Sequence, residues 1–379
     1  MNDLLLTNDF PPNRPGGISD YLCNLAVHWK DMVVLTDAAP GAYTGDRDCG
    51  CKVYRTMLGK AVAAIPFGCI YSLFLIYKYK IGIIHCGNAS PFRWVAFALS
   101  LLTGKPYVIY YYGNDLLRFA RKTRRSRVRR TLAKAVLTRA AAIVTISRYT
   151  RDLFTANFPY VNKERILLVV PGIGAQFLNR SVEEPRFVPG ETARMVSVGR
   201  LNERKGFDRV IESLPLIAAR GFKVSYTIAG KGDQRPFREL AKKTGVENCV
   251  TFMGYLQSQD DVIRQIERSH LFIMPSRVIG DSEVEGFGIV FLQAAALKRP
   301  SIGSATGGIP DAVDDGCTGL LVKNPESPEE IAEVVVSLLR TPERLSILGK
   351  AGYERVNREF DWRIICRRFK GQLRTLIHE

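Results

Sequence analysis

Short runs of aliphatic and β-branched residues alternate with helical stretches along the whole of this 379-residue chain. In its first half the strand-like runs are LLLTNDF, DMVVLTD, KIGIIHC, KPYVIYYY, AAIVTIS and RILLVV. Strands separated by helices form a parallel sheet with helices packed on its faces. The alternation therefore predicts an α/β fold of the doubly wound, Rossmann-like type.

The alternation is interrupted once and then begins again. A polar stretch with two prolines, RSVEEPRFVPGET, is followed by ARMVSVG, KVSYTIAG, CVTFMG, LFIMPS, RPSIGS and GLLV. A chain of this length exceeds one ordinary core. We predict an N-terminal domain over 1–178 and a C-terminal domain over 179–360, facing a cleft, with a helix of about 361–379 packing back on the first domain. Function is expected in the loops after the strands, where open α/β sheets bind ligands.

The net charge of +17 is concentrated in one segment. Residues 116–151 contain twelve Lys or Arg and no Asp or Glu, and within them Val128, Leu132 and Val136 recur every fourth position. A basic helix with an apolar stripe can lie on anionic lipid, although a solvated helix face is the alternative. The residues predicted to bind the membrane are Arg121, Lys122, Arg124, Arg125, Arg127, Arg129 and Arg130. The segment lacks the interleaved aromatics of a nucleic-acid binder, so we expect no nucleic-acid partner.

A second segment, residues 61–77, carries no charge. Its length is at the short limit of the ~20 residues that span a bilayer. Because it contains Pro66 and Gly68 and leads into a strand-like run, we predict a buried core helix instead. The start of the chain lacks a basic region ahead of an apolar run, and the eight cysteines show no metal-ligand spacing. We expect a cytoplasmic protein, peripheral on the inner face of the cell membrane.

The first glycine-rich cluster, PPNRPGGIS, lies between the first strand and the first helix. Gly16 and Gly17 let backbone N–H groups approach an anion at a helix N-terminus. A tight turn without a ligand is the alternative. A second glycine turn, at Gly230, follows another strand and could line the nucleotide pocket.

Two further clusters lie in the C-terminal half. In VGRLNERKG, Arg200 and Lys205 follow a strand and can neutralise a leaving diphosphate without metal. In EVEGFGIVFLQ, Glu285 adjoins the turn Gly286, Phe287 and Gly288, where a carboxylate and backbone amides can bind sugar hydroxyls. Gln293 follows on the next helix and projects toward the same end.

In this order, the three clusters resemble glycosyltransferase family 4, a retaining family with the GT-B fold. The resemblance covers nearly the whole chain, and the stretch SRVIGDSEVEGFGIV is similar to mannosyltransferases of the phosphatidylinositol mannoside type. It implies that Arg200 and Lys205 bind the diphosphate, that Glu285 and the residues from Gly286 to Gly288 bind the donor sugar, and that Gln293 binds the ribose.

Two positions depart from the family pattern. Tyr112 stands where the family has a histidine near the reaction centre, and Gln293 replaces the second glutamate of the E-x7-E motif. A tyrosine hydroxyl and an amide oxygen still form hydrogen bonds, but without a full charge. We treat Tyr112 as a catalytic candidate, together with Arg200, Lys205 and Glu285.

The resemblance implies transfer of a hexosyl unit from GDP-mannose or a UDP-sugar to an acceptor hydroxyl, on a lipid-linked or membrane-surface glycan. The donor is a substrate, so no cofactor and no metal are expected. Asp46 and Asp48 have the D-x-D spacing of metal-dependent transferases but lie in a glycine-rich loop. A catalytically silent subunit that binds a sugar nucleotide is the alternative, because two motif positions differ.

Overall fold

The computed structural model describes residues 2–12, 16–38, 50–56, 65–88, 91–280 and 283–378, and these form two compact units. Unit 1 comprises Met1–Gly172 and Trp362–Glu379, and unit 2 comprises Ile173–Asp361. The division falls a few residues before the predicted boundary, because the Ile173 N–H donates to the Phe360 carbonyl and ties this segment to unit 2. Each unit is an α/β domain with an all-parallel sheet, as the alternating pattern predicted.

Unit 1 contains a 7-stranded sheet in the order β3-β2-β1-β4-β5-β6-β7. Its strands are β1 (Asn2–Leu6), β2 (Met32–Asp37), β3 (Lys52–Thr56), β4 (Ile81–Cys86), β5 (Tyr107–Tyr111), β6 (Ala142–Thr145) and β7 (Ile166–Leu168). Its helices are α1 (Gly17–His28), α3 (Ile65–Tyr79), α4 (Phe92–Thr103), α5 (Asn114–Arg124), α6 (Arg127–Arg139), α7 (Arg148–Asn157) and α15 (Trp362–His378).

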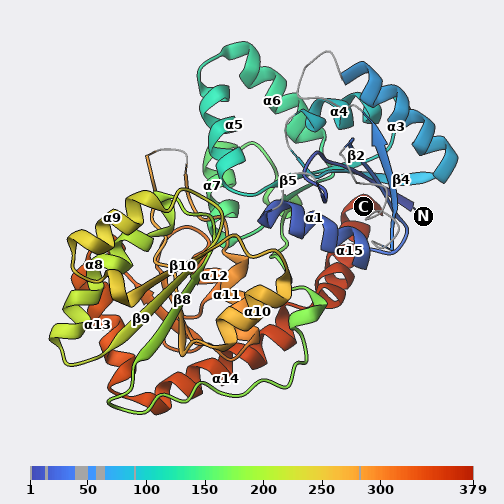
Figure 1. Ribbon diagram of the computed structural model, residues 1–379. Coiled ribbons are helices and arrows are strands. Elements are labelled where there is room, and N and C mark those ends of the chain that lie inside the picture. The colour runs from blue at the N-terminus through green and yellow to red at the C-terminus, as the bar shows by residue number, and fades with distance from the viewer. Residues whose placement is uncertain are drawn as a thin grey trace. The chain divides into compact units, whose positions relative to one another are not determined.

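The helices of unit 1 cover the two faces of the sheet unequally. Side chains of α3, α4, α5, α6 and α7 join one buried cluster on one face. On the other face α15 packs against α1 (Figure 1), with the Trp362 and Tyr21 rings 5.1 Å apart. The C-terminal helix therefore returns to the first unit, and α3–α7 form one outer layer.

Unit 2 contains a 6-stranded sheet in the order β10-β9-β8-β11-β12-β13. Its strands are β8 (Ala193–Val198), β9 (Val224–Ala229), β10 (Val250–Gly254), β11 (Leu271–Ile273), β12 (Ser301–Ser304) and β13 (Gly319–Val322). Its helices are α8 (Phe207–Ala219), α9 (Arg235–Lys243), α10 (Gln259–Glu267), α11 (Ile289–Ala296), α12 (Ile309–Ala312), α13 (Pro328–Leu339) and α14 (Pro342–Glu359).

Residues 65–77 of the uncharged segment lie in α3, and residues 61–64 lie outside the described residues. One side of α3 agrees with the prediction and the other does not. Its inner side joins the core through Leu75 and Ile76, as a core helix should. Its outer side bears large apolar side chains that are between 52% and 73% exposed: Phe67, Ile70, Phe74 and Tyr77. Within the described ranges, no helix is both long enough and apolar enough to cross a bilayer.

Candidate donor-binding site

Two loops of unit 2 meet at the carboxyl ends of adjacent parallel strands. The β8–α8 loop holds Gly199 to Gly206, and the segment between β11 and α11 holds Glu283 to Gly288. Because β8 and β11 are neighbours in the sheet, both loops emerge at the same edge. This edge is where parallel sheets bind ligands.

An ion cluster joins the two loops. The Lys205 ammonium lies 2.5 Å from a Glu285 carboxylate oxygen, and the Arg204 guanidinium lies 2.8 Å from the same oxygen. The three side chains are only 11% to 14% exposed. Burial alone would raise the pKa of Glu285, but attraction from Lys205 and Arg204 outweighs it and lowers the pKa to about 2. Glu285 is therefore ionised, and it holds both cations in fixed positions.

Arg200 lies near this cluster but is not part of it. Burial lowers the pKa of Lys205, and the positive charges of Arg204 and Arg200 add to that effect. Arg200 itself is exposed, and among the described residues its guanidinium has no hydrogen-bond or ion-pair partner. Arg204, Lys205 and Glu285 therefore carry a net positive charge, and the nearby Arg200 guanidinium is available to bind an added anion.

Glycines allow the backbone of these loops to approach one another. Gly230 has φ +152°, and a Cβ there would lie 1.8 Å from the Gly199 carbonyl oxygen. Gly206 has φ +74°, and a Cβ there would lie 2.3 Å from the Pro275 oxygen. No side chain fits at either position without moving the loop. The role of Gly230 is thus first to close the turn, and donor contact there remains a prediction.

The loop after Glu285 leads directly into α11. Gly288, with φ +89°, precedes the helix, and Phe287 is buried with its ring 6.1 Å from that of Phe360. The Gly308 N–H donates to the Glu285 carbonyl at 2.9 Å and fixes the backbone. Gln293 is half-buried on α11. The predicted donor-binding residues Gly286, Phe287 and Gly288 therefore lie in one rigid turn beside Glu285.

The predicted residues of unit 1 lie at the carboxyl edge of its own sheet. Gly17 begins α1, and Gly16 before it supplies no side-chain cap to the helix N-terminus. Tyr112, after β5, is 8% exposed, and its hydroxyl donates to the Gly87 carbonyl at 2.8 Å. Its ring packs edge-on against Tyr21 at 5.7 Å. The hydroxyl that we predicted to act in catalysis thus has a backbone partner within unit 1.

The sequence reasoning missed a polar network at this edge. The Asn88 amide donates to Asp9 at 2.8 Å and accepts from the Asn8 N–H at 2.9 Å. Asp115 accepts from the Tyr112 N–H, and burial raises the pKa of its carboxyl group to about 6. These residues follow β1, β4 and β5. Their position after strand ends was therefore the only feature of the sequence that could have marked them as candidates for the site. Arg204 was also missed, although it is adjacent to Lys205.

The seven predicted membrane-binding residues lie on α5, on α6 and in the short break between them, and all are exposed. Ser126 caps α6 by accepting from the Arg129 N–H. The expected apolar stripe is not continuous, because Val136 is buried in the core whereas Val128 and Leu132 are 68% and 45% exposed. Asp46 and Asp48 lie outside the described residues. Among the described residues, no group of His, Cys, Asp or Glu could hold a metal ion.

Comparisons with known proteins match the two halves of the chain to two glycosyltransferase models. The model of Glycosyltransferase Family 4 matches residues 15–177, and that of Glycosyl transferases group 1 matches residues 181–355. The chain is 29% identical to the GDP-mannose-dependent alpha-(1-6)-phosphatidylinositol monomannoside mannosyltransferase of Mycobacterium tuberculosis H37Rv, over 98% of this chain and 97% of that protein.

Solved structures show the same fold at lower sequence identity. Sucrose-phosphate synthase of Thermosynechococcus elongatus is similar with a TM-score of 0.75 and 20% identity, over 100% of this chain and 99% of that one. Anabaena HepE in complex with UDP and glucose has a TM-score of 0.75 and 17% identity, over 99% and 100%. The two Rossmann-like units are those of a GT-B fold, and with two family models matched in sequence order the chain belongs to glycosyltransferase family 4.

Proposed function

We propose that this glycosyltransferase moves a hexosyl unit from a nucleoside diphosphate sugar to a hydroxyl group of a lipid-linked or glycolipid acceptor, with retention and without a metal ion. The observation that carries the proposal is the cluster of Arg204 and Lys205 around Glu285 at the carboxyl edge of the unit 2 sheet, with the charge of Arg200 acting on Lys205. Retention rests on the family resemblance.

In the reaction, the bond from the anomeric carbon to the diphosphate breaks and a bond to the acceptor oxygen forms. Negative charge develops on the leaving diphosphate, and preorganised cations stabilise it most in a water-poor site. Lys205 and Arg204 are held by Glu285, and Arg200 adds a charge that has no ion-pair partner in the part of the chain that the structure describes. The acceptor proton passes to a departing phosphate oxygen, so positioning matters more than a protein base. This scheme does not need the Tyr112 hydroxyl.

For the donor we favour GDP-mannose, with a UDP-sugar as the second choice. The M. tuberculosis relative is named for GDP-mannose and matches nearly the whole chain, whereas the more distant Anabaena structure holds UDP. The same relative acts on a phosphatidylinositol monomannoside by name, which favours an acceptor at a membrane.

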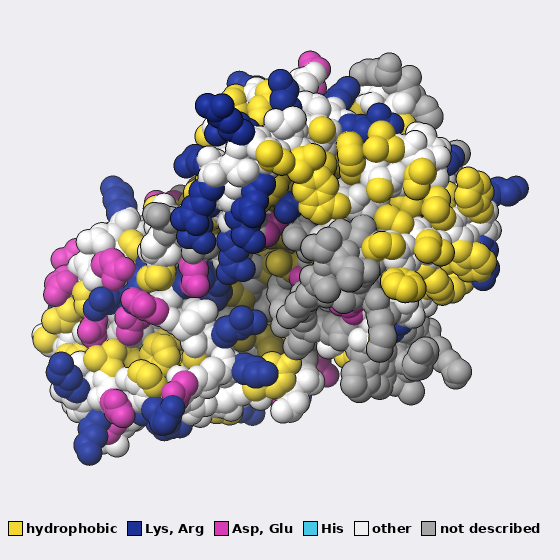
Figure 2. Space-filling view, turned by 90° about the horizontal axis from the view of Figure 1, so that it is seen from above, with side chains coloured by type: hydrophobic (Ala, Val, Ile, Leu, Met, Phe, Trp, Pro, Cys, Tyr) yellow, Lys and Arg dark blue, Asp and Glu magenta, His cyan; other side chains and the backbone are white. Residues whose placement is uncertain are grey.

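Two surfaces on the outer layer of unit 1 favour docking to the inner face of the cell membrane. The basic surface consists of the seven predicted residues of α5 and α6. The apolar surface consists of Phe67, Ile70, Phe74 and Tyr77 of α3 with Leu101 and Leu102 of α4, each more than half exposed. Figure 2 shows apolar side chains gathered over α3 and α4, and Lys and Arg over α5 and α6, on one face. A helix that is apolar on both sides needs an apolar neighbour on each, and a lipid bilayer supplies one.

The test is a transfer assay with labelled GDP-mannose, UDP-glucose and UDP-galactose in the presence of vesicles that contain phosphatidylinositol and its mannosides. We expect label from one donor to enter the lipid fraction, with and without EDTA, and the product to keep the donor's anomeric configuration. A Lys205→Ala variant serves as the inactive control. Donor binding without transfer under any condition would instead favour the silent-subunit alternative.

A further inference from the structure

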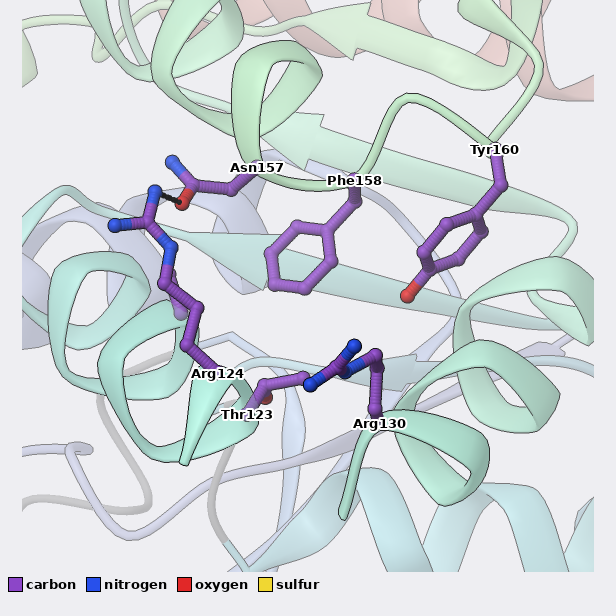
Figure 3. A pocket seen from close by; sticks show the side chains of 7 residues that line it. Thr123, Arg124, Arg130, Asn157, Phe158 and Tyr160 are labelled. Carbon is purple, nitrogen blue, oxygen red and sulfur yellow. Dashed lines mark hydrogen bonds between the residues drawn. The ribbon is translucent and has the colours of Figure 1, made fainter. Parts of the chain in front are cut away.

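A pocket of about 300 Å³ lies in the outer layer of unit 1, away from the strand ends. Residues of α5, α6, the last residue of α7 and the segment after it line the pocket: Ala120, Thr123, Arg124, Arg130, Asn157, Phe158 and Tyr160. Figure 3 shows the Arg124, Arg130 and Tyr160 side chains arranged around the Phe158 ring. The lining therefore combines an apolar floor with polar groups at its rim, and it includes no carboxylate.

The polar groups of this pocket offer donors. The Arg124 guanidinium donates to the Asn157 side-chain oxygen at 2.6 Å, which fixes its direction. Arg130 is exposed, and within the described residues its guanidinium has no acceptor. The Lys134 ammonium lies 5.9 Å from the centre of the Tyr160 ring and adds a third positive charge.

The Tyr160 hydroxyl is a further polar group of this pocket, and it lacks a hydrogen-bond partner in the described structure. Its oxygen is buried, and burial raises the pKa of this phenol, so it remains a donor. An unpaired buried polar group is costly unless something satisfies it. A ligand with several acceptor oxygens and a negative charge would satisfy Tyr160 and both arginines together.

We propose that this pocket binds the phosphate of an anionic phospholipid headgroup. A phosphate offers the acceptors and the charge that paired guanidinium groups favour. A lipid is preferred to a free phosphate because exposed Val128 and Leu132 lie on the same helix as Arg130, and the apolar surface belongs to the same layer. The proposal rests on the membrane docking described above but not on catalysis. The proposal adds one specific phosphate-binding pocket to the exposed basic surface of α5 and α6.

The experiment compares three variants in co-sedimentation with phosphatidylglycerol vesicles. Arg130→Gln removes a pocket cation, and Arg129→Gln removes the adjacent exposed cation that does not line the pocket. Tyr160→Phe removes the buried hydroxyl at constant charge. We expect Arg129→Gln to weaken binding by about fivefold, the effect of one surface charge. Arg130→Gln should weaken it by at least tenfold and Tyr160→Phe by about threefold, with no fall in Tm for either variant.

Soluble probes distinguish the source of the phosphate. Glycerophosphoglycerol should compete with vesicles for the wild type and should fail to bind the Arg130→Gln variant, whereas equal competition by inorganic phosphate would assign the pocket to free phosphate. Equal effects of Arg129→Gln and Arg130→Gln, with no effect of Tyr160→Phe, would overturn the site. Sugar-nucleotide binding, measured on the same preparations, tests the proposed function separately.

Discussion

The cations of unit 2 and those of α5 and α6 in unit 1 differ in their partners. Arg204 and Lys205 are buried and share the carboxylate of Glu285. The seven residues of the basic surface are exposed, and in the described structure Arg124 is the only one whose charged side chain has a hydrogen-bond partner. Paired, buried cations have one geometry and suit one small ligand, whereas unpaired cations on a surface suit an extended anionic partner. The two regions should therefore respond to different substitutions.

The largest effect is expected in unit 2. Lys205→Ala should reduce transfer by about 10²- to 10³-fold, the usual loss when one preorganised charge-stabilising group is removed. The matched control is Lys223→Ala, an exposed lysine before β9 at the opposite end of the sheet. Steady-state kinetics compares them, and Lys205→Ala activity within a few-fold of wild type would show that the cluster does not serve the donor. Circular dichroism checks that the variant folds.

The next effect belongs to the basic surface. The combined variant Arg124→Glu, Arg125→Glu and Arg127→Glu should reduce binding to anionic vesicles by about 100-fold at low salt, because each basic residue contributes ~1 kcal/mol at the membrane. Lys242→Glu, Lys243→Glu and Lys350→Glu make the same charge change in unit 2 and should have little effect. Co-sedimentation at two salt concentrations measures both, and equal losses in the two triple variants would mean that only net charge matters.

A smaller effect, insensitive to salt, is expected on the apolar surface. Phe67→Ser with Ile70→Ser should weaken vesicle binding by about tenfold, because shallow insertion realises only about a third of the ~1.5–3 kcal/mol that full burial of each large apolar side chain contributes. Both side chains are at least 65% exposed, so Tm should not fall. Unchanged binding to vesicles by this variant would leave α3 without a role in docking.

The sequence alone predicts some of the strands and helices well and others poorly. The strands of unit 2 were all predicted, because each is an apolar run with a glycine, proline or polar residue at its ends. Strand β3 was missed, because at the sheet edge the short run KVYRT is only partly buried and mixes charge with apolar residues. The exposed side of α3 was also missed, because composition does not show which side of an apolar helix faces the core.

The sequence predicts where the residues of the candidate site lie along the chain better than it predicts which of their side chains are in contact. Arg200, Lys205 and Glu285 follow strand ends, which local pattern reveals. The sharing of Glu285 between Lys205 and Arg204 depends on the adjacency of β8 and β11, which no local pattern encodes. The partner of the Tyr112 hydroxyl, the Gly87 carbonyl, follows a different strand and was hidden for the same reason.

The smallest effect is expected at Tyr112. Tyr112→Phe keeps the ring against Tyr21 and loses the bond to the Gly87 carbonyl, so the free energy of unfolding should fall by about 1 kcal/mol. Transfer should fall by less than about threefold. A tenfold loss, equivalent to ~1.4 kcal/mol, would return the hydroxyl to the reaction centre. Chemical denaturation and kinetics give the two quantities.

The central claim is that unit 2 binds a nucleoside diphosphate sugar through Arg200 and Lys205, independently of the outer layer of unit 1. Thermal unfolding with GDP-mannose, UDP-glucose, GDP and UDP tests it most directly, because a ligand at a hundred times its Kd stabilises the native state by about 2.7 kcal/mol. We predict a Tm rise of several degrees with one sugar nucleotide, equal in the wild type and in the triple Arg→Glu variant of α5 and α6, and absent in Arg200→Ala and Lys205→Ala. No rise with any of the four ligands, or an undiminished rise in both alanine variants, would contradict it.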